Sequence, residues 1–187
     1  MIKIPCVFVR DFTDKNKAVL TKEIALGCEW VLNGEGKATR KYDGTACAVI
    51  NGVKYARYDA KRGKKPPAGA IPCCPPDEVT GHHPHWIVLD EKTHKYIIEA
   101  FGDSFYEDGT FEAVGEKINA NKESLKGHHV VRHGETEVIC PDRTFEGIFK
   151  YLSGSRIEGI VFHHPDGRMA KIRRNDYGLE WGCQISK

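Results

Sequence analysis

The sequence predicts an α+β protein in which antiparallel strands outnumber helices. One observation is the Asn51-Gly52 turn between two alternating segments, residues 45–50 and 53–58, which predicts a hairpin. A second predicted hairpin joins residues 159–163 to residues 168–173. Because strands that are neighbours in sequence pair antiparallel, we expect mostly antiparallel sheets with flanking helices.

Two segments are expected to be helical. Residues 16–28 place their apolar side chains near helical spacing. Residues 144–152 begin with Thr144, a residue type that caps helix N-termini, and Gly154 follows just beyond the predicted end.

The rest of the chain is assigned to strands and loops. Strands are expected at residues 29–32, 86–89, 96–101, 110–114 and 129–132. Residues 61–84 are rich in glycine and proline and are expected to form a loop insertion. The length of the chain therefore predicts a single domain, residues 1–187, that carries this loop.

Composition narrows the class of protein. Apolar residues make up 40% of the 187 residues and charged residues 29%, which is typical of a globular protein. The net charge is only +2, so the overall charge of the protein does not by itself indicate nucleic-acid binding. No apolar run approaches the roughly 20 residues that cross a bilayer. The first five residues lack the apolar core of a signal peptide. A cytoplasmic protein without a membrane partner is expected.

The seven cysteines predict reduced thiols, since their number is odd and their spacing fits no disulfide framework. A candidate zinc site lies in the loop, where two cysteines precede three histidines: Cys73, Cys74, His82, His83 and His85. The spacing matches no standard zinc finger, and four prolines favour an ordinary surface loop. Metal binding in this loop is left open.

The segment Lys41-Tyr42-Asp43-Gly44 carries the first candidate chemistry. A lysine amine is a nucleophile in its neutral form, and nearby cations such as Arg57 favour that form. Gly44 lets a nucleotide approach the backbone closely, and Asp43 can orient the lysine or the ribose. Taken alone, the segment is also typical of an exposed strand lysine beside an Asp-Gly turn.

Three carboxylates are candidates for nucleotide and metal binding. Glu112 and Glu116 are four residues apart, so on a strand they share one face and either can bind ribose hydroxyls. Glu158 leads into the apolar segment 159–163 and can coordinate the magnesium that accompanies a nucleoside triphosphate. Solvated acids at a strand edge or a turn are the alternatives.

A pair of cations follows on the last predicted strand. Lys171 and Arg173 alternate, so both point to one face of the strand. Two cations there can hold an α-phosphate and stabilise its charge in a transition state. A solvated hairpin face is the alternative.

In their order along the chain, these elements resemble the covalent nucleotidyltransferase superfamily of polynucleotide ligases and messenger-RNA capping enzymes. Lys41-Tyr42-Asp43-Gly44 resembles motif I, residues 57–59 the basic motif after it, 111–116 motif III, 158–162 motif IV, and 171–173 motif V. The greatest similarity is to small RNA ligases of the RNA ligase 1 family, on residues 57–64, 76–82 and 115–121. The resemblance spans about residues 30–181.

The resemblance implies a nucleotidyltransferase core, similar to ATP-grasp, and an ATP-dependent RNA ligase that acts in RNA repair. In such an enzyme Lys41 takes AMP from ATP, passes it to the 5′-phosphate of an RNA end, and a 3′-hydroxyl then displaces it. The cofactors implied are ATP and Mg²⁺, with Mn²⁺ as a substitute. The implied roles are catalysis by Lys41, Asp43 and Lys171, metal binding by Glu158, and nucleotide binding by Arg40, Gly44, Arg57, Glu112 or Glu116, Glu158, Lys171 and Arg173.

Only six residues follow Trp181, so we expect no appended oligonucleotide-binding domain. Either the nucleotide-binding core holds the RNA itself or a partner helps. Exposed cations beside aromatics suit single-stranded ends, so Arg62, Lys64 and Lys65 mark a candidate RNA path. Two alternatives are a capping-type guanylyltransferase and a non-catalytic module that binds nucleotide or RNA. The sequence predicts no particular protein partner.

Overall fold

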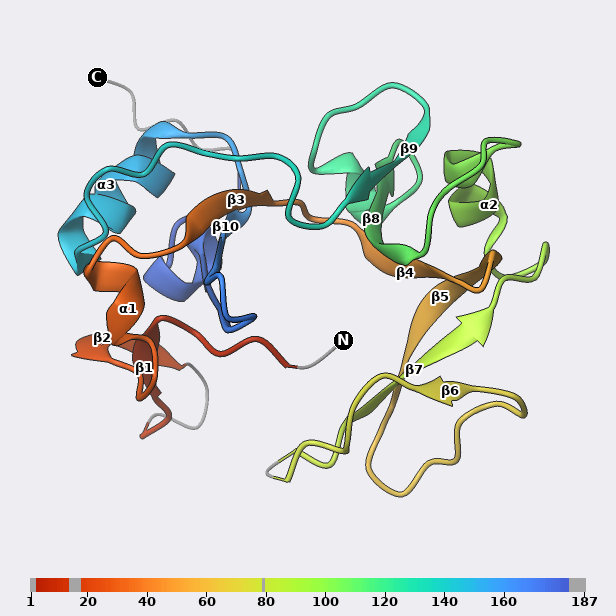
Figure 1. Cartoon of the computed structure of the whole chain (residues 1–187), viewed down its shortest axis with the longest axis horizontal. Coiled ribbons are helices and arrows are strands. Elements are labelled where there is room, and N and C mark those ends of the chain that lie inside the picture. The colour runs from red at the N-terminus through yellow and green to blue at the C-terminus, as the bar shows by residue number, and fades with distance from the viewer. Residues whose placement is uncertain (1–2, 14–17, 79, 182–187) are drawn as a thin grey trace. The chain divides into compact units, whose positions relative to one another are not determined.

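The computed structural model describes residues 3–13, 18–78 and 80–181 (Figure 1). The chain divides into two compact units. Unit 1 comprises residues 1–3 and 43–133, and unit 2 comprises residues 4–42 and 134–187. The chain therefore passes from one unit to the other between Tyr42 and Asp43 and again between His133 and Gly134.

Unit 2 contains two small antiparallel sheets. One pairs β1 with β2, and the other has three strands in the order β11-β10-β3. Strands β3 and β10 lie side by side although one is early and the other late in the chain (Figure 1). The elements of unit 2 are β1 Phe8–Asp11, β2 Val19–Ile24, α1 Glu29–Leu32, β3 Lys37–Lys41, α3 Phe145–Gly154, β10 Gly159–His163, β11 Met169–Arg173 and the 3-10 turn η2 Arg174–Tyr177.

Alternation along the three-stranded sheet separates an apolar face from a polar face. Ile160, Phe162 and Ile172 are fully buried and belong to one core with Ile148 and Leu152 of α3. The residues between them in sequence point the other way. The polar face consequently carries side chains from all three strands, among them Lys41, Thr39, Val161, Lys171 and Arg173.

Helix α3 begins at its predicted cap but extends beyond its predicted end. The Thr144 side chain accepts a hydrogen bond of 3.1 Å from the Gly147 amide, which satisfies one of the free donors of the first turn. Gly154 is the last helical residue and Ser155 follows it as the C-cap. The predicted boundary therefore differs by two residues.

Unit 1 is built on one six-stranded antiparallel sheet in the order β6-β7-β5-β4-β8-β9. The Asn51-Gly52 turn joins β4 to β5 as predicted, with both residues at positive φ. The elements of unit 1 are β4 Thr45–Ile50, β5 Val53–Ala60, β6 Ile71–Pro72, β7 His83–Val88, α2 Lys95–Phe101, β8 Gly109–Gly115, η1 Asn119–Asn121 and β9 His128–Arg132.

Helix α2 shares a core with one face of this sheet. Cys47, Ala56 and Phe111 stand opposite one another on β4, β5 and β8, and they form a buried cluster with Ile97 and Phe101 of α2. The opposite face carries a smaller cluster of Ala48, Tyr55 and Trp86. By alternation, Arg57 and Glu112 also lie on that opposite face.

Three secondary-structure predictions are wrong. The described part of the predicted helix 16–28 contains β2, because pairing with β1 outweighs the helical spacing, and residues 16 and 17 lie outside the described residues. Residues 29–32 form helix α1 and not a strand. Residues 96–101 belong to helix α2, where Ile97, Ala100 and Phe101 follow the i, i+3, i+4 spacing of a buried helix face.

The mixed fold with mainly antiparallel sheets and few helices confirms the coarse fold prediction. The predicted loop 61–84 contains the short strand β6, which pairs with β7. Strand β7 begins at His83 and not at residue 86, because residues 83–85 pair with β5. Among the described residues, no helix is long and apolar enough to cross a membrane. That the two units act as one adenylyltransferase domain stays a prediction.

Candidate active site

The segment Lys41-Tyr42-Asp43-Gly44 is divided between the two units. Lys41 is the last residue of β3 in unit 2, whereas Asp43 and Gly44 lead into β4 of unit 1. Lys41 and Gly44 therefore belong to different units.

In unit 2, the Lys41 ammonium and the Glu158 carboxylate form an ion pair. Both side chains are largely buried, with 24% of Lys41 and 16% of Glu158 exposed. The Lys41 Nζ atom also lies 3.4 Å from the carbonyl oxygen of Tyr42. The structure thus brings together the predicted nucleophile and the predicted metal ligand, which are 117 residues apart in sequence.

Gly159 allows the strands of this site to approach closely. It lies opposite Lys41 on β3 and opposite Arg173 on β11. A β-carbon at this position would stand 2.3 Å from the carbonyl oxygen of Ile172 and 2.9 Å from the α-carbon of Arg173. Only glycine fits there, so the Glu158-Gly159 pattern has a steric reason.

Lys171 is a half-buried cation beside other cations. Burial, and after it the nearby cations Arg173, Lys41 and Arg10, together lower the pKa of its amine to about 8, while Asp176 acts in the opposite direction. A lysine in this environment loses its proton at a lower pH than a solvated lysine does. An anion bound nearby would restore its charge.

Arg173 is held by Asp176, a residue that the sequence analysis missed. The Arg173 backbone amide donates to Asp176 Oδ2 at 2.8 Å, and its guanidinium reaches Asp176 Oδ1 at 2.9 Å. The side-chain hydrogen bond to Asp176 raises the pKa of the Arg173 guanidinium. The Arg10 guanidinium lies 2.8 Å from the same carboxylate, so Asp176 holds two cations. The i, i+3 spacing signals the first pair, but nothing in the sequence signals Arg10.

Arg40 is the predicted nucleotide contact that the strand geometry separates from Lys41. Adjacent strand residues point to opposite faces, and Arg40 lies beside Lys41 on β3. The Arg40 guanidinium stands over the Tyr42 ring at 4.4 Å from its centroid. This cation–π contact gives Arg40 a packing role.

In unit 1, Glu112 holds the start of β4. Its Oε1 atom accepts a hydrogen bond of 3.1 Å from the Gly44 amide, and its Oε2 atom lies 2.9 Å from His133 Nε2. A β-carbon on Gly44 would stand 2.1 Å from the carbonyl oxygen of Ala113, so glycine is required for this approach. His133 is a further residue that the sequence analysis missed.

The two candidate acids of motif III differ in position. Glu112 belongs to β8, whereas Glu116 follows Gly115, where β8 ends at a φ of 144°. Glu116 is exposed and Glu112 is half-buried beside Gly44. The break at Gly115 explains why the even spacing does not keep both acids on one strand face.

The Asp43 side chain is bound within unit 1. Its Oδ1 atom accepts from the Asn119 side-chain amide at 3.1 Å, and its Oδ2 atom lies 2.8 Å from Lys122 Nζ. The Asp43 backbone amide donates to Glu123 Oε1 at 2.8 Å. Asn119, Lys122 and Glu123 carry no sequence signal for this contact.

The other predicted cations of unit 1 are exposed. Arg57 pairs with Asp59, whose Oδ1 atom is 2.9 Å from Arg57 Nε. Arg62, Lys64 and Lys65 lie in the loop between β5 and β6, and none of them pairs with a carboxylate among the described residues. The loop therefore presents uncompensated positive charge to solvent.

The candidate zinc residues do not assemble into a site in the described part of the chain, where no group of three or more His, Cys, Asp or Glu residues is placed to hold a metal. Neither Cys73 nor Cys74 is part of a disulfide in the described part of the chain. His85 Nδ1 bonds to the His83 carbonyl oxygen at 2.8 Å, and the two rings pack 4.1 Å apart.

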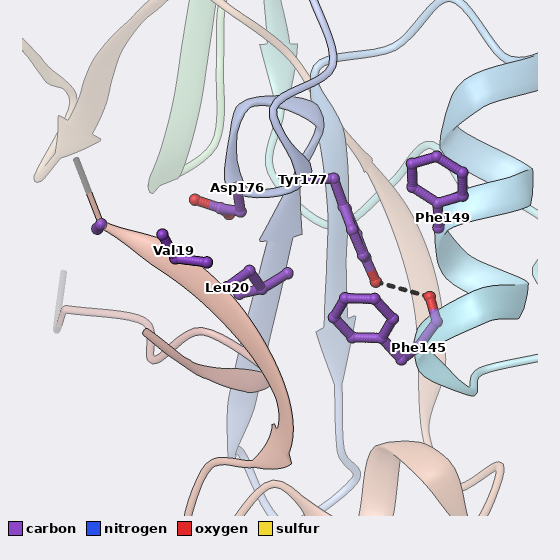
Figure 2. A pocket seen from close by; sticks show the side chains of 7 residues that line it. Val19, Leu20, Phe145, Phe149, Asp176 and Tyr177 are labelled. Atoms are coloured by element: carbon purple, nitrogen blue, oxygen red, sulfur yellow. Dashed lines mark hydrogen bonds between the residues drawn. The ribbon is translucent and has the colours of Figure 1, made fainter. Parts of the chain in front are cut away.

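Figure 2 shows a pocket in unit 2 that contains none of the predicted site residues. Aromatic and aliphatic side chains line most of it, and Tyr177 donates a hydrogen bond of 3.0 Å to the Phe145 carbonyl. Its lining residues are Ala18, Val19, Leu20, Phe145, Phe149, Asp176 and Tyr177. Asp176 borders the pocket and also holds Arg173, but the pocket itself is largely apolar.

The polar face of unit 2 has the composition of an anion site. It combines an amine and two further cations on one small sheet with the Glu158 carboxylate that pairs with the amine, and groups of these kinds bind phosphates by charge-assisted hydrogen bonds. The arrangement is thus chemically suited to a phosphorylated ligand beside a lysine amine.

Comparison with known proteins shows a similarity to one family. A family model described as RNA ligase 1 matches residues 98–186. A protein named RNA ligase 1 from Danio rerio is 24% identical in an alignment of length 264. The alignment covers 96% of this chain and 81% of that protein. Its namesake from Rattus norvegicus is 25% identical with the same coverage. A third, from Pongo abelii, is 26% identical over 142 residues, or 57% of this chain and 43% of that protein.

These matches confirm the predicted resemblance to the RNA ligase 1 family. They cover the segments of both units, although the identity is low. The similarity therefore supports the resemblance to this family. The roles of individual residues have to be argued from the geometry of the site.

Proposed function

We propose that this protein is an ATP-dependent RNA ligase whose nucleophile is Lys41. The observation that carries the proposal is the placement of Lys41, Lys171 and Arg173 on one sheet face, with Glu158 paired to Lys41, in a chain similar to proteins named RNA ligase 1. In the first step, the neutral Lys41 amine attacks the α-phosphorus of ATP. A phosphorus–nitrogen bond forms, the bond to pyrophosphate breaks, and the amine loses its proton.

Two transfers complete the proposed reaction. An RNA 5′-phosphate oxygen attacks the lysyl-AMP, which frees Lys41 and leaves AMP on the RNA end. The 3′-hydroxyl of a second end then attacks the activated phosphate, a phosphodiester bond forms, and AMP leaves. Lys171 and Arg173 hold the α-phosphate oxygens and stabilise their charge in these steps.

Unit 1 contains further residues that we assign to nucleotide binding. Gly44 allows close approach of the backbone, and Glu112 holds the Gly44 amide. In this assignment Glu112, and not the exposed Glu116, is the motif III acid that contacts the ribose, while Arg57 contacts phosphate. Each of these contacts is part of the proposal.

A magnesium ion fits the residues around Glu158. Magnesium is bound in such sites by one or two carboxylates together with substrate phosphates and water, and Glu158 supplies one carboxylate beside the amine. The ion would neutralise charge on the phosphates when it is bound. Manganese shares this preference for oxygen ligands.

Replacement of Glu158 tests whether its carboxylate binds the metal or only holds Lys41 as an ammonium. Replacing Glu158 by alanine should slow lysyl-AMP formation by about a hundredfold, the scale seen when one preorganised electrostatic group is lost. The measurement is a single-turnover rate with ATP across a magnesium series. If the pair served only to hold Lys41 as an ammonium, the same substitution would instead raise the rate, and the metal assignment would be wrong.

The test of the proposed function is the covalent adduct itself. Incubation with ATP and magnesium should leave one AMP on the protein, attached to Lys41, as read by intact-mass analysis and peptide mapping. Lys41→Ala should form no adduct, because no other group replaces the amine. Lys37→Ala, at the other end of β3, is the matched control and should react normally.

The alternatives give different results in the same assay. A capping-type guanylyltransferase would be labelled by GTP and not by ATP. A binding module without catalysis would hold nucleotide tightly and form no adduct at all. An adduct of equal yield in Lys41→Ala would show that another residue is the nucleophile.

A further inference from the structure

The turn that follows Lys41 is held by two other segments of unit 1. Five polar groups of Asp43 and Gly44 have partners there: both amides, both carboxylate oxygens of Asp43, and the Gly44 carbonyl. Asn119 bonds to the Asp43 carboxylate and to the Gly44 carbonyl, so one side-chain amide bridges the two residues. With Lys122, Glu123 and Glu112, this contact leaves the turn little freedom.

The segment that supplies most of these contacts, residues 119–124, has an unusual backbone. Four of the five non-glycine residues with positive φ in the described chain lie here: Asn119 at 45°, Ala120 at 55°, Asn121 at 50° and Ser124 at 55°. Left-handed conformations are sparsely populated for residues with a β-carbon and cost free energy. Such conformations persist only where the surrounding structure enforces them.

The structure shows what enforces this conformation. Ile118 is buried in the core beneath α2, and the Asn121 side chain makes two hydrogen bonds of 3.0 Å to the backbone of Leu125. The segment is thus fastened at both ends, and its polar side chains Asn119 and Lys122 are directed at Asp43. Backbone strain that is stored in this way is typical of functional sites.

We propose that residues 119–124 are a positioning element, which we call the turn clamp, for the nucleophile-bearing segment. The clamp fixes Asp43 and Gly44 so that the backbone immediately after Lys41 holds its geometry when the amine attacks. Asp43 then acts as the anchor of the clamp and not as a contact to nucleotide. This inference rests on the proposed function, because it assigns the clamp to the covalent step.

The effect of the clamp on geometry can be measured without ATP. Hydrogen exchange of the Asp43 and Gly44 amides, followed by NMR, reports whether the turn stays closed. Asn119→Ala and Lys122→Met should speed the exchange of both amides about tenfold, since each removes part of the clamp. Lys126→Met, an exposed lysine in the same loop without a contact to Asp43, is the matched control and should leave both amides protected.

The effect on chemistry is measured in the adduct assay. Lys122→Met should lower the maximal rate of lysyl-AMP formation about tenfold and leave half-saturation by ATP within about twofold, because misplacement of a reacting group costs rate and not ground-state binding. Lys122→Arg keeps the charge beside Asp43 and should restore most of the rate. Thermal unfolding within a few degrees of wild type would exclude general misfolding.

A double-mutant cycle separates the anchor from a nucleotide contact. If Asp43 works through the clamp, Asp43→Asn combined with Lys122→Met should cost no more rate than the worse single variant. Additive losses would show that Asp43 acts on the nucleotide independently and would overturn the inference.

The remaining outcomes are also decisive. Unchanged amide exchange in Asn119→Ala and Lys122→Met would show that the clamp does not hold the turn. Faster exchange with an unchanged adduct rate would show that the turn does not position the nucleophile. A wild-type protein that forms no adduct would refute the proposed function, and the assignment of the clamp to catalysis would fall with it, while the exchange data would still report on the clamp as a structural element.

Discussion

Lys171 links the burial of one side chain to the pH range of the proposed reaction. Its pKa is lowered to about 8 by burial and by the neighbouring cations Arg173, Lys41 and Arg10. Between about pH 8 and 10.5, the unfolded chain holds a proton at this lysine that the folded chain has lost. The contribution of Lys171 to the free energy of unfolding therefore rises with pH across that window.

The same pKa predicts a pH dependence of ATP binding. Above about pH 8, Lys171 is increasingly neutral in the free protein, so half-saturation of lysyl-AMP formation should require more ATP as the pH rises from 7 to 9.5. Lys171→Arg, whose guanidinium stays charged, should lose this alkaline dependence. An identical profile in the two proteins would show that Lys171 does not contact the nucleotide. Calorimetry in buffers of different ionisation enthalpy is a second check, since binding near pH 8 should take up protons.

At this scale, sequence reasoning succeeded where strand alternation applies. Lys171 and Arg173 share a face as predicted, because both lie inside the regular strand β11. The choice between Glu112 and Glu116 could not be made from spacing, because Gly115 ends the strand between them. Contacts such as Arg10 with Asp176 join residues that are far apart in sequence and carry no local signal.

At the scale of elements, Gly159 decides how closely β10 and β11 pair. Gly159→Ala should destabilise the protein by about 1–3 kcal/mol, since a β-carbon 2.3 Å from the Ile172 carbonyl oxygen forces the strands apart. Urea unfolding measures this change. Gly154→Ala is the matched control: the last residue of α3 has nothing within 4 Å of the added carbon, so that substitution should be neutral or stabilising by up to about 1 kcal/mol. Equal stability of the two variants would contradict the steric argument.

Elements with local signals were predicted well, and those that depend on remote partners were not. The Asn51-Gly52 hairpin and the Thr144 cap are specified by neighbouring residues and are confirmed. Strand β2 depends on pairing with β1, which is not visible in its own sequence. The near-helical spacing of its apolar residues therefore led to a wrong prediction of a helix. Helix α2 did carry a helical pattern in Ile97, Ala100 and Phe101, but its length of 7 residues left the pattern short.

At the scale of the whole molecule, the exposed cations of the loop predict a separation of activities. Neutralising Arg62, Lys64 and Lys65 together should leave lysyl-AMP formation unchanged and weaken the sealing of RNA that carries a 5′-phosphate. The salt slope of RNA binding should fall by roughly 0.7 for each phosphate contact that is lost. The measurement pairs the adduct assay with ligation of a nicked RNA across a salt series.

The matched control removes the same charge elsewhere. Lys92, Lys126 and Lys150 are exposed, and their joint replacement should alter neither activity. Equal loss of both activities in the loop variant would place its cations at the triphosphate. An unchanged ligation rate and salt slope would show that the loop does not contact RNA.

The division into two units could not be read from the sequence. No change of composition marks the passage after Tyr42 or the return after His133, and each crossing falls next to a strand end. Strand β3 pairs with β10 within unit 2. Between these two strands the sequence runs through residues 43–133, which are all of unit 1 except its first three residues. Similarity at low identity to proteins named RNA ligase 1 supports the family resemblance, but pattern analysis has no access to such long-range pairing.

This order of segments has a consequence for synthesis on the ribosome. Strand β3 is made early, yet its sheet partner β10 begins only at Gly159. At about 5–20 residues per second, β3 remains without that partner for on the order of ten seconds, during which the whole contiguous sheet of unit 1 emerges. Unit 1 can thus complete its fold while the nascent chain is still growing, whereas the lysine-bearing strand gains its partner only after residues 159–163 have been made.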